Sequence, residues 1–407
     1  MIILADPAPQ IVAQLTHHGM GRLADGTLVP RVLPGEEVAP RPDGSWRILR
    51  PSELRVSPPC VHFAACGGCA VQHAPDAYVA DWKAGIVLQA LAAQGIEGEV
   101  GRVLTSPPNS RRRARLAGRR TKGGALLGFH ARASDTVIDT PRCRILTPAL
   151  IALRPALLDL VRLAATRSRE VAITLTDSPA GADVVLDDAR ELDLALRQEA
   201  ATWAASAGVA RFTWNNELVA QAEPPWLPLG RARVVPPPGA FLQATREGEA
   251  ALVSLVREAT RGATRIADLF AGVGTFALPL AETAEVHGVE GEAAMLKALQ
   301  KGWRSAPGLH RVTTEARDLF RRPLDAADLR RFEAAVIDPP RAGAEAQVAE
   351  LAAARLPVVA YVSCSPASFA RDAHTLLAAG YGMDPVTVVD QFRWSPHVEL
   401  ATRFSLG

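Results

Sequence analysis

The sequence predicts a chain of three parts: a small β-barrel, a mixed α+β central region and a doubly wound α/β domain. The strongest observation is the regular alternation of apolar strand-length and helix-length segments after residue 237. A second is the set of short β segments, separated by glycine and proline, that precede residue 58. A third is a proline-rich stretch over 224–238, which can sustain neither a helix nor a central strand. We therefore expect domains at 1–57, 58–236 and 237–407.

The composition is that of a globular protein with more than one domain. A chain of 407 residues exceeds one ordinary domain, and 48% hydrophobic with 22% charged residues is enough to bury several cores. The amino terminus lacks the basic and apolar regions of a secretory signal, and no uncharged stretch approaches a membrane-spanning length. We therefore expect a cytoplasmic protein without a membrane partner. A monomer is the expected state, since no residue pattern indicates an oligomer.

The amino-terminal part reads as short strands joined by tight turns. Glycine and proline interrupt the apolar residues every few positions, which is typical of small barrels of the oligonucleotide-binding kind. The expected strands cover residues 11–15, 18–22, 26–30, 33–38 and 46–49.

The central part mixes helices with hairpins. Helical periodicity predicts helices over 77–94 and 147–165. Two apolar runs at 171–175 and 183–186 flank a Ser-Pro-Ala-Gly turn and predict a hairpin, and a second hairpin is expected through 212–219.

The carboxyl-terminal part alternates strands with helices. Strands are expected at 265–270, 285–290, 312–314, 335–338 and 358–363. Their apolar character indicates a parallel sheet covered on both faces, as in doubly wound nucleotide-binding domains.

A glycine-containing loop follows the first of these strands. Asp268 ends the strand, Gly272 and Gly274 permit a tight turn, and Glu290 ends the second strand where a carboxylate can bind ribose hydroxyls. The third glycine of the dinucleotide fingerprint is missing, which disfavours NAD. An acidic residue, a G-x-G turn and a second acidic residue suit S-adenosylmethionine, although glycine turns after strands are also common for packing reasons.

Cys364 is a candidate nucleophile. It lies in Val-Ser-Cys-Ser-Pro at the carboxyl end of an apolar run, 26 residues after the Asp-Pro-Pro-Arg segment that begins at Asp338. Open α/β sheets hold their reactive groups at the carboxyl ends of strands. A single cysteine in a strand is more often a small core residue, so Cys364 alone would favour a packing role.

Four other cysteines predict a metal site. Cys60, Cys66 and Cys69 have the spacing C-x5-C-x2-C around two glycines, and Cys143 follows downstream. A disulfide framework is improbable in a reducing compartment. A structural zinc ion and an iron-sulfur cluster both satisfy this spacing, and the residues alone leave the choice open.

A basic run lies in the central region. Seven cations fall within twelve residues that hold no acidic residue, at Arg111, Arg112, Arg113, Arg115, Arg119, Arg120 and Lys122. Its strand-like alternation would present charge to the phosphates of a nucleic acid, while the alternative is a solvated strand face. The net charge of +2 does not by itself imply a polyanionic partner.

Taken in order, these motifs resemble the S-adenosylmethionine-dependent RNA uracil-C5 methyltransferases, particularly the bacterial iron-sulfur members that modify large-subunit ribosomal RNA. The resemblance covers nearly the whole chain. It rests on the cysteine set, Phe241-Leu-Gln243, Asp268-Leu-Phe-Ala-Gly-Val-Gly, Asp338-Pro-Pro-Arg-Ala-Gly, Ser363-Cys-Ser-Pro and Pro396-His-Val-Glu399.

The resemblance implies a fold and a set of site residues. The fold would be a class I methyltransferase domain behind a TRAM-like barrel and an iron-sulfur domain. Cys364 would be the nucleophile and Glu399 the base, acting on a uridine of 23S rRNA. Cys60, Cys66, Cys69 and Cys143 would bind a 4Fe-4S cluster. The methyl-donor pocket would be formed by Gln243, Phe270, Thr275, Glu290, Asp318 and Asp338.

Three positions depart from the family pattern, and three other functions remain to be weighed. Thr245, Thr275 and Ser365 stand where the family usually or commonly has asparagine. A uridine-54-type tRNA methyltransferase is one alternative, but its members typically lack the cysteines. An amino-group methyltransferase would need an aromatic residue where Arg341 stands. A non-catalytic iron-sulfur RNA-binding protein is the third alternative, but it would not explain the donor loop or Glu399.

Overall fold

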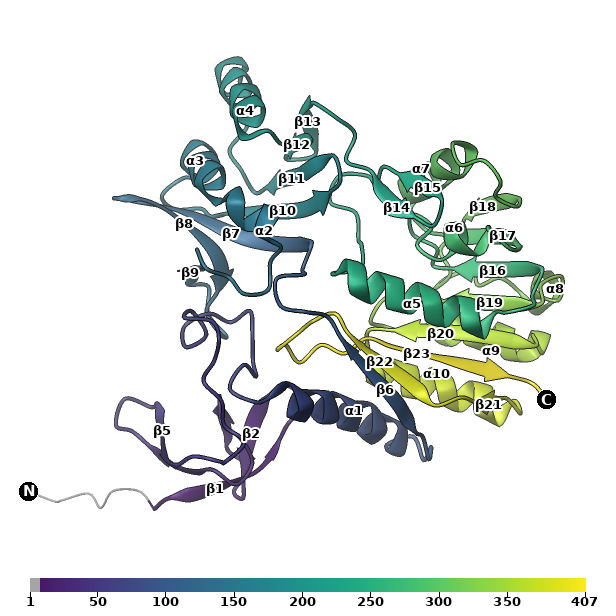
Figure 1. The fold of residues 1–407 in the computed structure, drawn as a ribbon, viewed down its shortest axis with the longest axis horizontal. Helices are drawn as coiled ribbons and strands as arrows, with labels where there is room; N and C mark the ends of the chain where they lie inside the picture. Colours follow the sequence, from purple (N-terminus) through teal and green to yellow (C-terminus); the bar gives the residue numbers. More distant parts are fainter. Residues whose placement is uncertain (1–7) are drawn as a thin grey trace, which may run out of the picture.

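The computed structural model describes residues 8–407 (Figure 1). Residues 1–7, part of the segment in which no secretory signal is found, lie outside the described residues. Between residues 8 and 407 no helix is both long and apolar enough to cross a bilayer.

The amino-terminal strands form one antiparallel sheet in the order β3-β2-β1-β4-β5. Val12, Leu23, Val29 and Val38 are buried between them because alternate side chains of each strand face the same side. β3 and β5 remain open edges, so the predicted barrel is a half-barrel. The strands are β1 (Gln10–Leu15), β2 (Met20–Leu23), β3 (Leu28–Pro30), β4 (Glu37–Pro40) and β5 (Trp46–Arg50).

The central region contains a seven-stranded sheet in the order β13-β12-β11-β10-β7-β8-β9. Its strands are β7 (Arg113–Thr121), β8 (Gly124–His130), β9 (Val137–Asp139), β10 (Val171–Ser178), β11 (Gly181–Asp187), β12 (Arg211–Trp214) and β13 (Glu217–Gln221). Both predicted hairpins are present. In the second, Asn215 and Asn216 have φ of 45° and 69°, the left-handed geometry that a two-residue hairpin turn requires.

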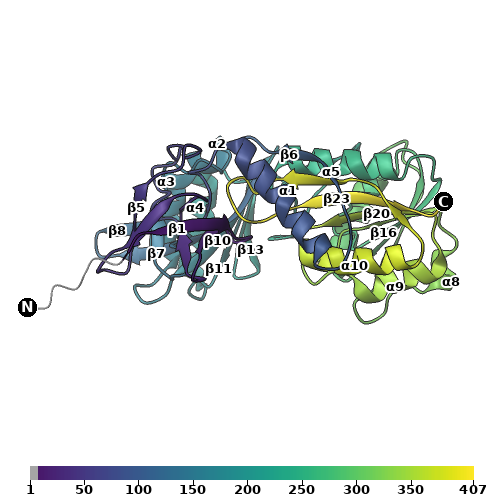
Figure 2. The same cartoon turned by 90° about the horizontal axis from the view of Figure 1, so that it is seen from below.

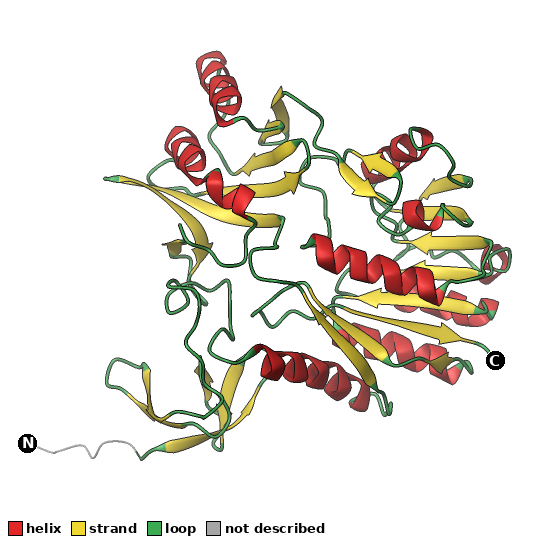
Figure 3. Ribbon diagram, viewed as in Figure 1, coloured by secondary structure: helices red, strands yellow, loops and turns green. Residues whose placement is uncertain are grey.

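The helices of the central region follow the prediction with one difference. α1 (Asp76–Ala92) matches the helix expected over 77–94. The helix expected over 147–165 is divided into α2 (Pro148–Ala152) and α3 (Arg154–Ala164), because Pro155 cannot donate a backbone hydrogen bond to the preceding turn. α3 and α4 (Leu194–Ala207) pack against the sheet (Figure 3).

The carboxyl-terminal domain is a nine-stranded sheet whose main path runs β18-β17-β16-β19-β20-β23-β22-β6, with β21 paired to β23. The first five strands of that path are parallel to one another, as predicted. Its strands are β6 (Val100–Thr105), β16 (Arg265–Leu269), β17 (Glu285–Glu290), β18 (Val312–Ala316), β19 (Ala334–Ile337), β20 (Val358–Ser363), β21 (Gly382–Met383), β22 (Val386–Asp390) and β23 (Leu400–Ser405).

Helices cover both faces of this sheet. α5 (Arg246–Ala259) packs on β20 and β23, and α9 (Glu345–Ala354) packs beside α10 (Pro366–Ala378) on the other face. α1 of the central region lies along α10 (Figure 2). The remaining helices are α6 (Ala277–Leu280), α7 (Ala293–Arg304) and α8 (Ala326–Leu329).

The expected boundary at 236 needs correction, because two pieces of 58–236 pack with the carboxyl-terminal domain. β6 forms the edge of its sheet by pairing in parallel with β22. β14 (Leu227–Leu229) and β15 (Ala232–Val234) form a hairpin inside the proline-rich stretch, and their apolar side chains join the core beneath α7. Pro228 is tolerated because this two-stranded hairpin has free edges.

The strand directions bring distant residues to one edge of the sheet. The carboxyl ends of β16, β17, β19 and β20 lie together because these strands are parallel. β23 runs antiparallel to both β20 and β22, so its amino end reaches the same edge. Residues 268–275, 290, 338, 364 and 391–399 therefore meet there.

Candidate active site

Cys364 and Glu399 are neighbours across two adjacent strands. Ser363, the last residue of β20, pairs with Leu400, the first residue of β23, so the residues just beyond them face each other. Cys364 is partly exposed at this edge, and Glu399 is 2% exposed. The predicted nucleophile and the predicted base therefore share one site.

Two glutamines connect the carboxylates of this site. Gln391 Nε2 donates to Glu399 Oε2 at 2.9 Å and to Gln243 Oε1 at 2.5 Å. Gln243 Nε2 in turn donates to Asp338 Oδ2 at 3.4 Å. Gln391 Oε1 accepts the Ala244 backbone N–H at 2.7 Å, which fixes the orientation of its amide. This chain of contacts holds Glu399 and Asp338 at defined positions beside the thiol.

The electrostatics of the site favour the neutral forms of its acids. Burial, with the Glu399 and Asp338 carboxylates, raises the pKa of Cys364 to about 11, opposed by the Arg341 guanidinium. Burial, with Asp338, raises the pKa of Glu399 to about 8. Burial raises the pKa of Asp338 to about 7. The site thus concentrates three acidic groups whose neutral forms are favoured, which suits a ligand that brings positive charge.

His397 and Arg341 lie at the rim of this site. Arg341 Nη2 is 3.2 Å from His397 Nδ1. Burial, with the positive charges of Arg341, Lys83 and Arg111, lowers the pKa of His397 to about 4, so its imidazole is neutral at physiological pH. Both residues are exposed to solvent.

The loop after β16 has the geometry of a ligand-binding turn. Phe270 has φ of 65°, a left-handed conformation that is costly for an aromatic residue and concentrates at functional sites. Gly272 has φ of 55° with open space where a Cβ would stand, so a ligand can approach its backbone. A Cβ on Gly274 would lie 2.8 Å from the Leu299 side chain, so that glycine is required for packing.

Glu290 and Asp268 flank this loop. Glu290 accepts the backbone N–H groups of Gly272 at 3.0 Å and Glu292 at 2.9 Å. Asp268 is fully buried, and its oxygens lack a well-formed hydrogen bond in the described part of the chain, although the Ala277 amide lies near enough to favour ionisation. Burial, with Asp338 and Glu290, raises the pKa of Asp268 to about 8. An orphaned buried carboxyl group fits a site completed by a cationic ligand.

The other predicted donor-pocket residues lie around the loop at different distances from the thiol. The Phe270 ring contacts Phe320 with centroids 5.4 Å apart. Asp318 is exposed and accepts the Phe320 backbone N–H at 3.0 Å, which shapes that aromatic wall. Thr275 lines a separate cavity of about 660 Å³ beside α5, so the structure does not bring its side chain into the Cys364 cluster.

Two of the three departures from the family pattern have structural roles. The Thr245 hydroxyl accepts the Gly248 backbone N–H at 2.9 Å and caps α5, and it contacts the Ser106 hydroxyl at 2.8 Å. Ser365 caps α10 by accepting the Ser368 N–H at 3.4 Å. Ser caps a helix about as well as asparagine does, and Thr does so somewhat less well.

The four clustered cysteines are brought together in space. Each of Cys66, Cys69 and Cys143 experiences the charge of other members of the set, and all have free thiols. Burial, with the charges of Cys143, Cys66 and Cys60, raises the pKa of Cys69 to about 12. Within residues 8–407, no group of three or more His, Cys, Asp or Glu side chains is arranged so that it could hold a metal ion.

The basic run divides into a structural half and an exposed half. Arg112 is 1% exposed and pairs with Glu249 at 2.5 Å, and Arg113 donates to the carbonyls of Gly239 and Ala240. Arg115 is paired with Asp187 at 2.9 Å. Exposed cations remain at Arg119, Arg120 and Lys122, toward the β7–β8 turn. The first arginines therefore anchor the segment that carries Gln243, and the last three are free to meet phosphates.

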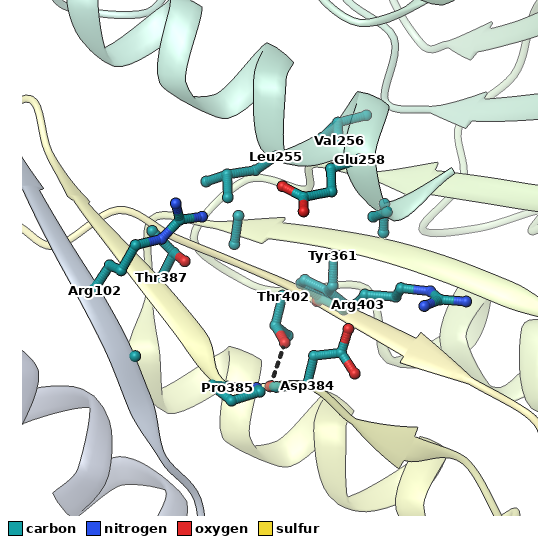
Figure 4. Close-up of a pocket in the computed structure, with 14 residues that line it drawn as sticks. Arg102, Leu255, Val256, Glu258, Tyr361, Asp384, Pro385, Thr387, Thr402 and Arg403 are labelled. Carbon is teal, nitrogen blue, oxygen red and sulfur yellow. Dashed lines mark hydrogen bonds between the residues drawn. The ribbon is translucent and has the colours of Figure 1, made fainter. Parts of the chain in front are cut away.

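A cavity of about 340 Å³ lies between α5 and the strands β6, β22 and β23 (Figure 4). Arg102, Glu258, Asp384 and Arg403 are among its lining residues, and the Thr402 hydroxyl donates to the Asp384 carbonyl there. None of the residues predicted for catalysis or donor binding lines it. The active site is therefore defined by the strand ends and not by this cavity.

Sequence reasoning missed two residues of the site. Gln391 lies 148 residues from Gln243 and eight from Glu399, and Lys83 lies 307 residues from its partner Asp390. A single glutamine after a strand or a single lysine within a helix forms no sequence motif that would mark it as functional. An apolar helix with one interior lysine, as in α1, would have been the available hint for Lys83.

Comparison with known proteins places the chain among RNA methyltransferases. Residues 237–403 match the family model described as tRNA (Uracil-5-)-methyltransferase. An uncharacterised RNA methyltransferase of Mesorhizobium japonicum is 42% identical over 94% of this chain and 93% of the relative. The 23S rRNA (uracil(1939)-C(5))-methyltransferase RlmD of Halomonas elongata is 34% identical over 96% of this chain and 87% of the relative.

A solved structure shares the fold over almost the whole chain. It is the Pyrococcus abyssi tRNA (uracil-54, C5)-methyltransferase in complex with S-adenosyl-L-homocysteine, with a TM-score of 0.76, 23% identity, and coverage of 97% of this chain and 99% of that one. The half-barrel and the class I methyltransferase domain are thus confirmed as one known architecture. Together with the sequence relatives, this shows that the chain belongs to the family of S-adenosylmethionine-dependent RNA (uracil-C5) methyltransferases.

Proposed function

We propose that this chain methylates carbon 5 of a uridine in 23S rRNA through a covalent adduct between Cys364 and carbon 6 of the base. The observation that supports this most is the placement of Cys364 beside Glu399, at the strand edge that also carries the donor loop. Carbon 5 of uracil is a weak nucleophile until a thiolate adds to carbon 6 and turns the ring into an enolate. The adduct activates the base, and the thiol does not carry the methyl group.

The steps assign one task to each side chain. Cys364 loses its proton to solvent and, as the thiolate, forms a bond to carbon 6, so that the displaced electron pair reaches carbon 5. S-adenosylmethionine would supply the methyl group: its bond from sulfur to the methyl carbon would break as the bond to carbon 5 forms, and S-adenosylhomocysteine would be left. Glu399 then takes the carbon 5 proton, and the pair left on carbon 5 restores the double bond as the bond from sulfur to carbon 6 breaks. The high pKa of Glu399 makes its ionised form a strong proton acceptor.

The donor pocket is proposed at the loop after β16. Glu290 lies where it can hold ribose hydroxyls, and Phe270 with Phe320 forms an aromatic wall. The carboxyl groups of Asp268 and Asp338 offer negative charge to the sulfonium and ammonium groups of the donor. Gln243, Thr275 and Asp318 complete the expected set, with Thr275 acting through the loop backbone, since its side chain lines another cavity.

We also propose that Cys60, Cys66, Cys69 and Cys143 bind a 4Fe-4S cluster. Each of Cys66, Cys69 and Cys143 senses the charge of other members of the set, so the four thiols lie within electrostatic range of one another. Four thiolates are the ligand set that a 4Fe-4S cluster takes. A structural zinc ion can take four thiolates as well, and metal analysis of the purified protein separates the two.

A covalent trap tests the mechanism. Glu399→Gln should form the adduct, transfer one methyl group and stall, so a protein-RNA species labelled from the donor should survive denaturing electrophoresis. Cys364→Ala should form no such species and lower turnover by roughly 10³-fold or more, while donor binding is retained. Multiple turnover by Glu399→Gln without a covalent species would assign the proton to another group.

The choice of 23S rRNA is supported by the relative from Halomonas elongata, with transfer RNA as the alternative that the family model's description favours. A strain lacking the gene should lose 5-methyluridine at one or more positions of 23S rRNA and keep it in tRNA. Mass spectrometric mapping of both RNA classes, with the gene restored as the control, gives the answer. Loss of 5-methyluridine from tRNA alone would contradict the ribosomal assignment.

A further inference from the structure

The segment that carries Glu399 is a loop of unusual backbone conformation. Residues 391–399 connect β22 to β23, and within them Trp394 has φ of 60°. A left-handed conformation is costly for a bulky side chain and persists only where surrounding contacts impose it. The contacts that impose it therefore decide where Glu399 stands.

Lys83 is the central contact beneath this loop. It belongs to α1, and its side chain is 0% exposed. Its Nζ donates to Asp390 Oδ1 at 2.5 Å, to the Phe392 carbonyl at 3.1 Å and to the His397 carbonyl at 2.8 Å. An ammonium group has three donors, so all three are used on the beginning and the end of one loop. His397 is two residues from Glu399.

Other contacts hold the middle of the loop from the same side. The backbone N–H groups of Ala70 and Val71, which follow Cys69, donate to the Trp394 carbonyl at 2.7 and 3.1 Å. The Arg111 guanidinium lies 5.6 Å from the centroid of the Phe392 ring. The loop is thus supported by residues that come before the methyltransferase domain in the sequence. Lys83 is the member of this support that carries a fully buried charge.

We propose that Lys83 is a positioning residue for the proton-abstraction step, and this inference rests on the proposed role of Glu399. Lys83 fixes the loop at both ends, and Glu399 follows directly, with its carbonyl accepting the Val389 N–H at 2.8 Å and its carboxylate held by Gln391. Cys364 is held differently, between β20 and the amino end of α10. Loss of the Lys83 contacts should therefore displace the base more than the nucleophile.

The competing explanation is that Lys83 only neutralises Asp390. Both side chains are fully buried, and removal of one partner leaves an uncompensated charge that destabilises the fold. The double variant Lys83→Met, Asp390→Asn separates the two explanations. It removes both charges, so folding stability should recover, but the carbonyls of Phe392 and His397 still lack their donor.

The experiment compares Lys83→Met, the double variant and Asp390→Asn with the wild-type protein. The measurements are thermal unfolding, S-adenosylmethionine affinity, steady-state turnover on 23S rRNA transcripts, and the fraction of methyl-labelled covalent protein-RNA species. We expect the double variant to unfold near the wild-type temperature, to bind the donor with unchanged affinity, to turn over roughly 10- to 100-fold more slowly and to accumulate the labelled species. Asp390→Asn alone should unfold at a lower temperature, because Lys83 is left unpaired, but should not accumulate the labelled species, because Lys83 still donates to both carbonyls.

The outcomes are separable. Recovery of both stability and turnover in the double variant would overturn the inference, because the ion pair would then explain everything. Slow turnover without the labelled species would also overturn it, because the step affected would precede methyl transfer. Glu399→Gln, run in parallel, tests the proposed function: if that variant traps no species, the role of Glu399 itself is wrong. Lys297→Met, at an exposed lysine on α7, is the matched control and should match the wild type in every measurement.

Discussion

Cys364 is a thiol whose immediate neighbours oppose its ionisation. Burial and the carboxylates of Glu399 and Asp338 raise its pKa to about 11, so the donor-free protein holds it as the neutral thiol at physiological pH. Addition to uracil requires the thiolate. Positive charge beside the thiol lowers its pKa, whereas the two carboxylates raise it. Under the proposed function, we therefore expect a link between the reactivity of the Cys364 thiol and occupancy of the donor pocket.

This link predicts a difference between S-adenosylmethionine and S-adenosylhomocysteine. The two have nearly the same shape, but the first carries a sulfonium cation and the second does not. The pKa of Cys364, measured from the pH dependence of its alkylation, should be lower with S-adenosylmethionine bound than with S-adenosylhomocysteine bound, by roughly one to three pH units. Cys364→Ala supplies the background from the other cysteines. Equal pKa values in the two complexes would show that the sulfonium does not control the thiol.

The residues of the site differ in how far the sequence predicts them. Cys364 and Asp338 lie at the ends of strands whose apolar runs are visible in the sequence, so their meeting at one edge could be predicted. Glu399 precedes β23, which was not expected from the sequence, and only the family resemblance pointed to it. Gln391 and Lys83 could not be predicted, because their roles depend on contacts across 148 and 307 residues that no local pattern encodes. Thr275, which belongs to the motif expected to bind the donor, lines a cavity beside α5, and its part in the donor pocket stays a prediction.

At the scale of elements, local rules predicted the five parallel strands and the two hairpins of the central sheet, but missed β6, the β14–β15 hairpin and the last three strands. They also did not show which basic side chains would be buried. The Asn215-Asn216 turn follows from its two residues alone. The basic run does not, because the burial of Arg112 against Glu249 depends on where α5 packs. The basic run, which the sequence suggested for phosphate contact over its whole length, has its first arginines bonded within the protein and only its last three cations exposed and free to contact phosphates.

The exposed end of β7 and its turn therefore carry the RNA-binding prediction for this element. Changing Arg119, Arg120 and Lys122 together to alanine should weaken RNA binding without changing donor affinity or the unfolding temperature. If each cation contacts one phosphate, the slope of log affinity against log salt concentration should fall by about 0.7 to 0.9 for each. Filter binding across a salt series measures this.

Exposed cations on another element provide the control. Lys297, Lys301 and Arg304 lie on α7, which packs against β15 and β18 of the methyltransferase domain. Their replacement by alanine removes the same charge. An equal loss of RNA affinity in both triple variants would indicate a general charge effect and not a contact at the tip of β7.

At the scale of the molecule, the three parts predicted from the sequence are interlocked. β6 completes the methyltransferase sheet, α1 packs on α10, and Lys83 of α1 supports the loop before β23. Domain boundaries read from the sequence depend on local composition. The packing of the elements depends on which surfaces of the whole chain bury one another. Deleting the region before residue 237 would therefore remove a strand of the catalytic sheet as well as a separate unit.

The loop that carries Cys60, Cys66 and Cys69 belongs to this interlocked region. The last prediction concerns the metal that these cysteines bind together with Cys143. Protein purified without oxygen should be brown and contain about four iron and four sulfide per chain at full occupancy. Cys66→Ser should lower both, and Cys364→Ala, which removes the cysteine outside the cluster, should leave both unchanged. Because Ala70 and Val71 follow Cys69 and hold the Trp394 carbonyl, Cys66→Ser should also increase hydrogen exchange in the 391–399 loop. Stoichiometric zinc in colourless anaerobic protein would contradict the cluster and show that the four thiolates bind a single zinc ion.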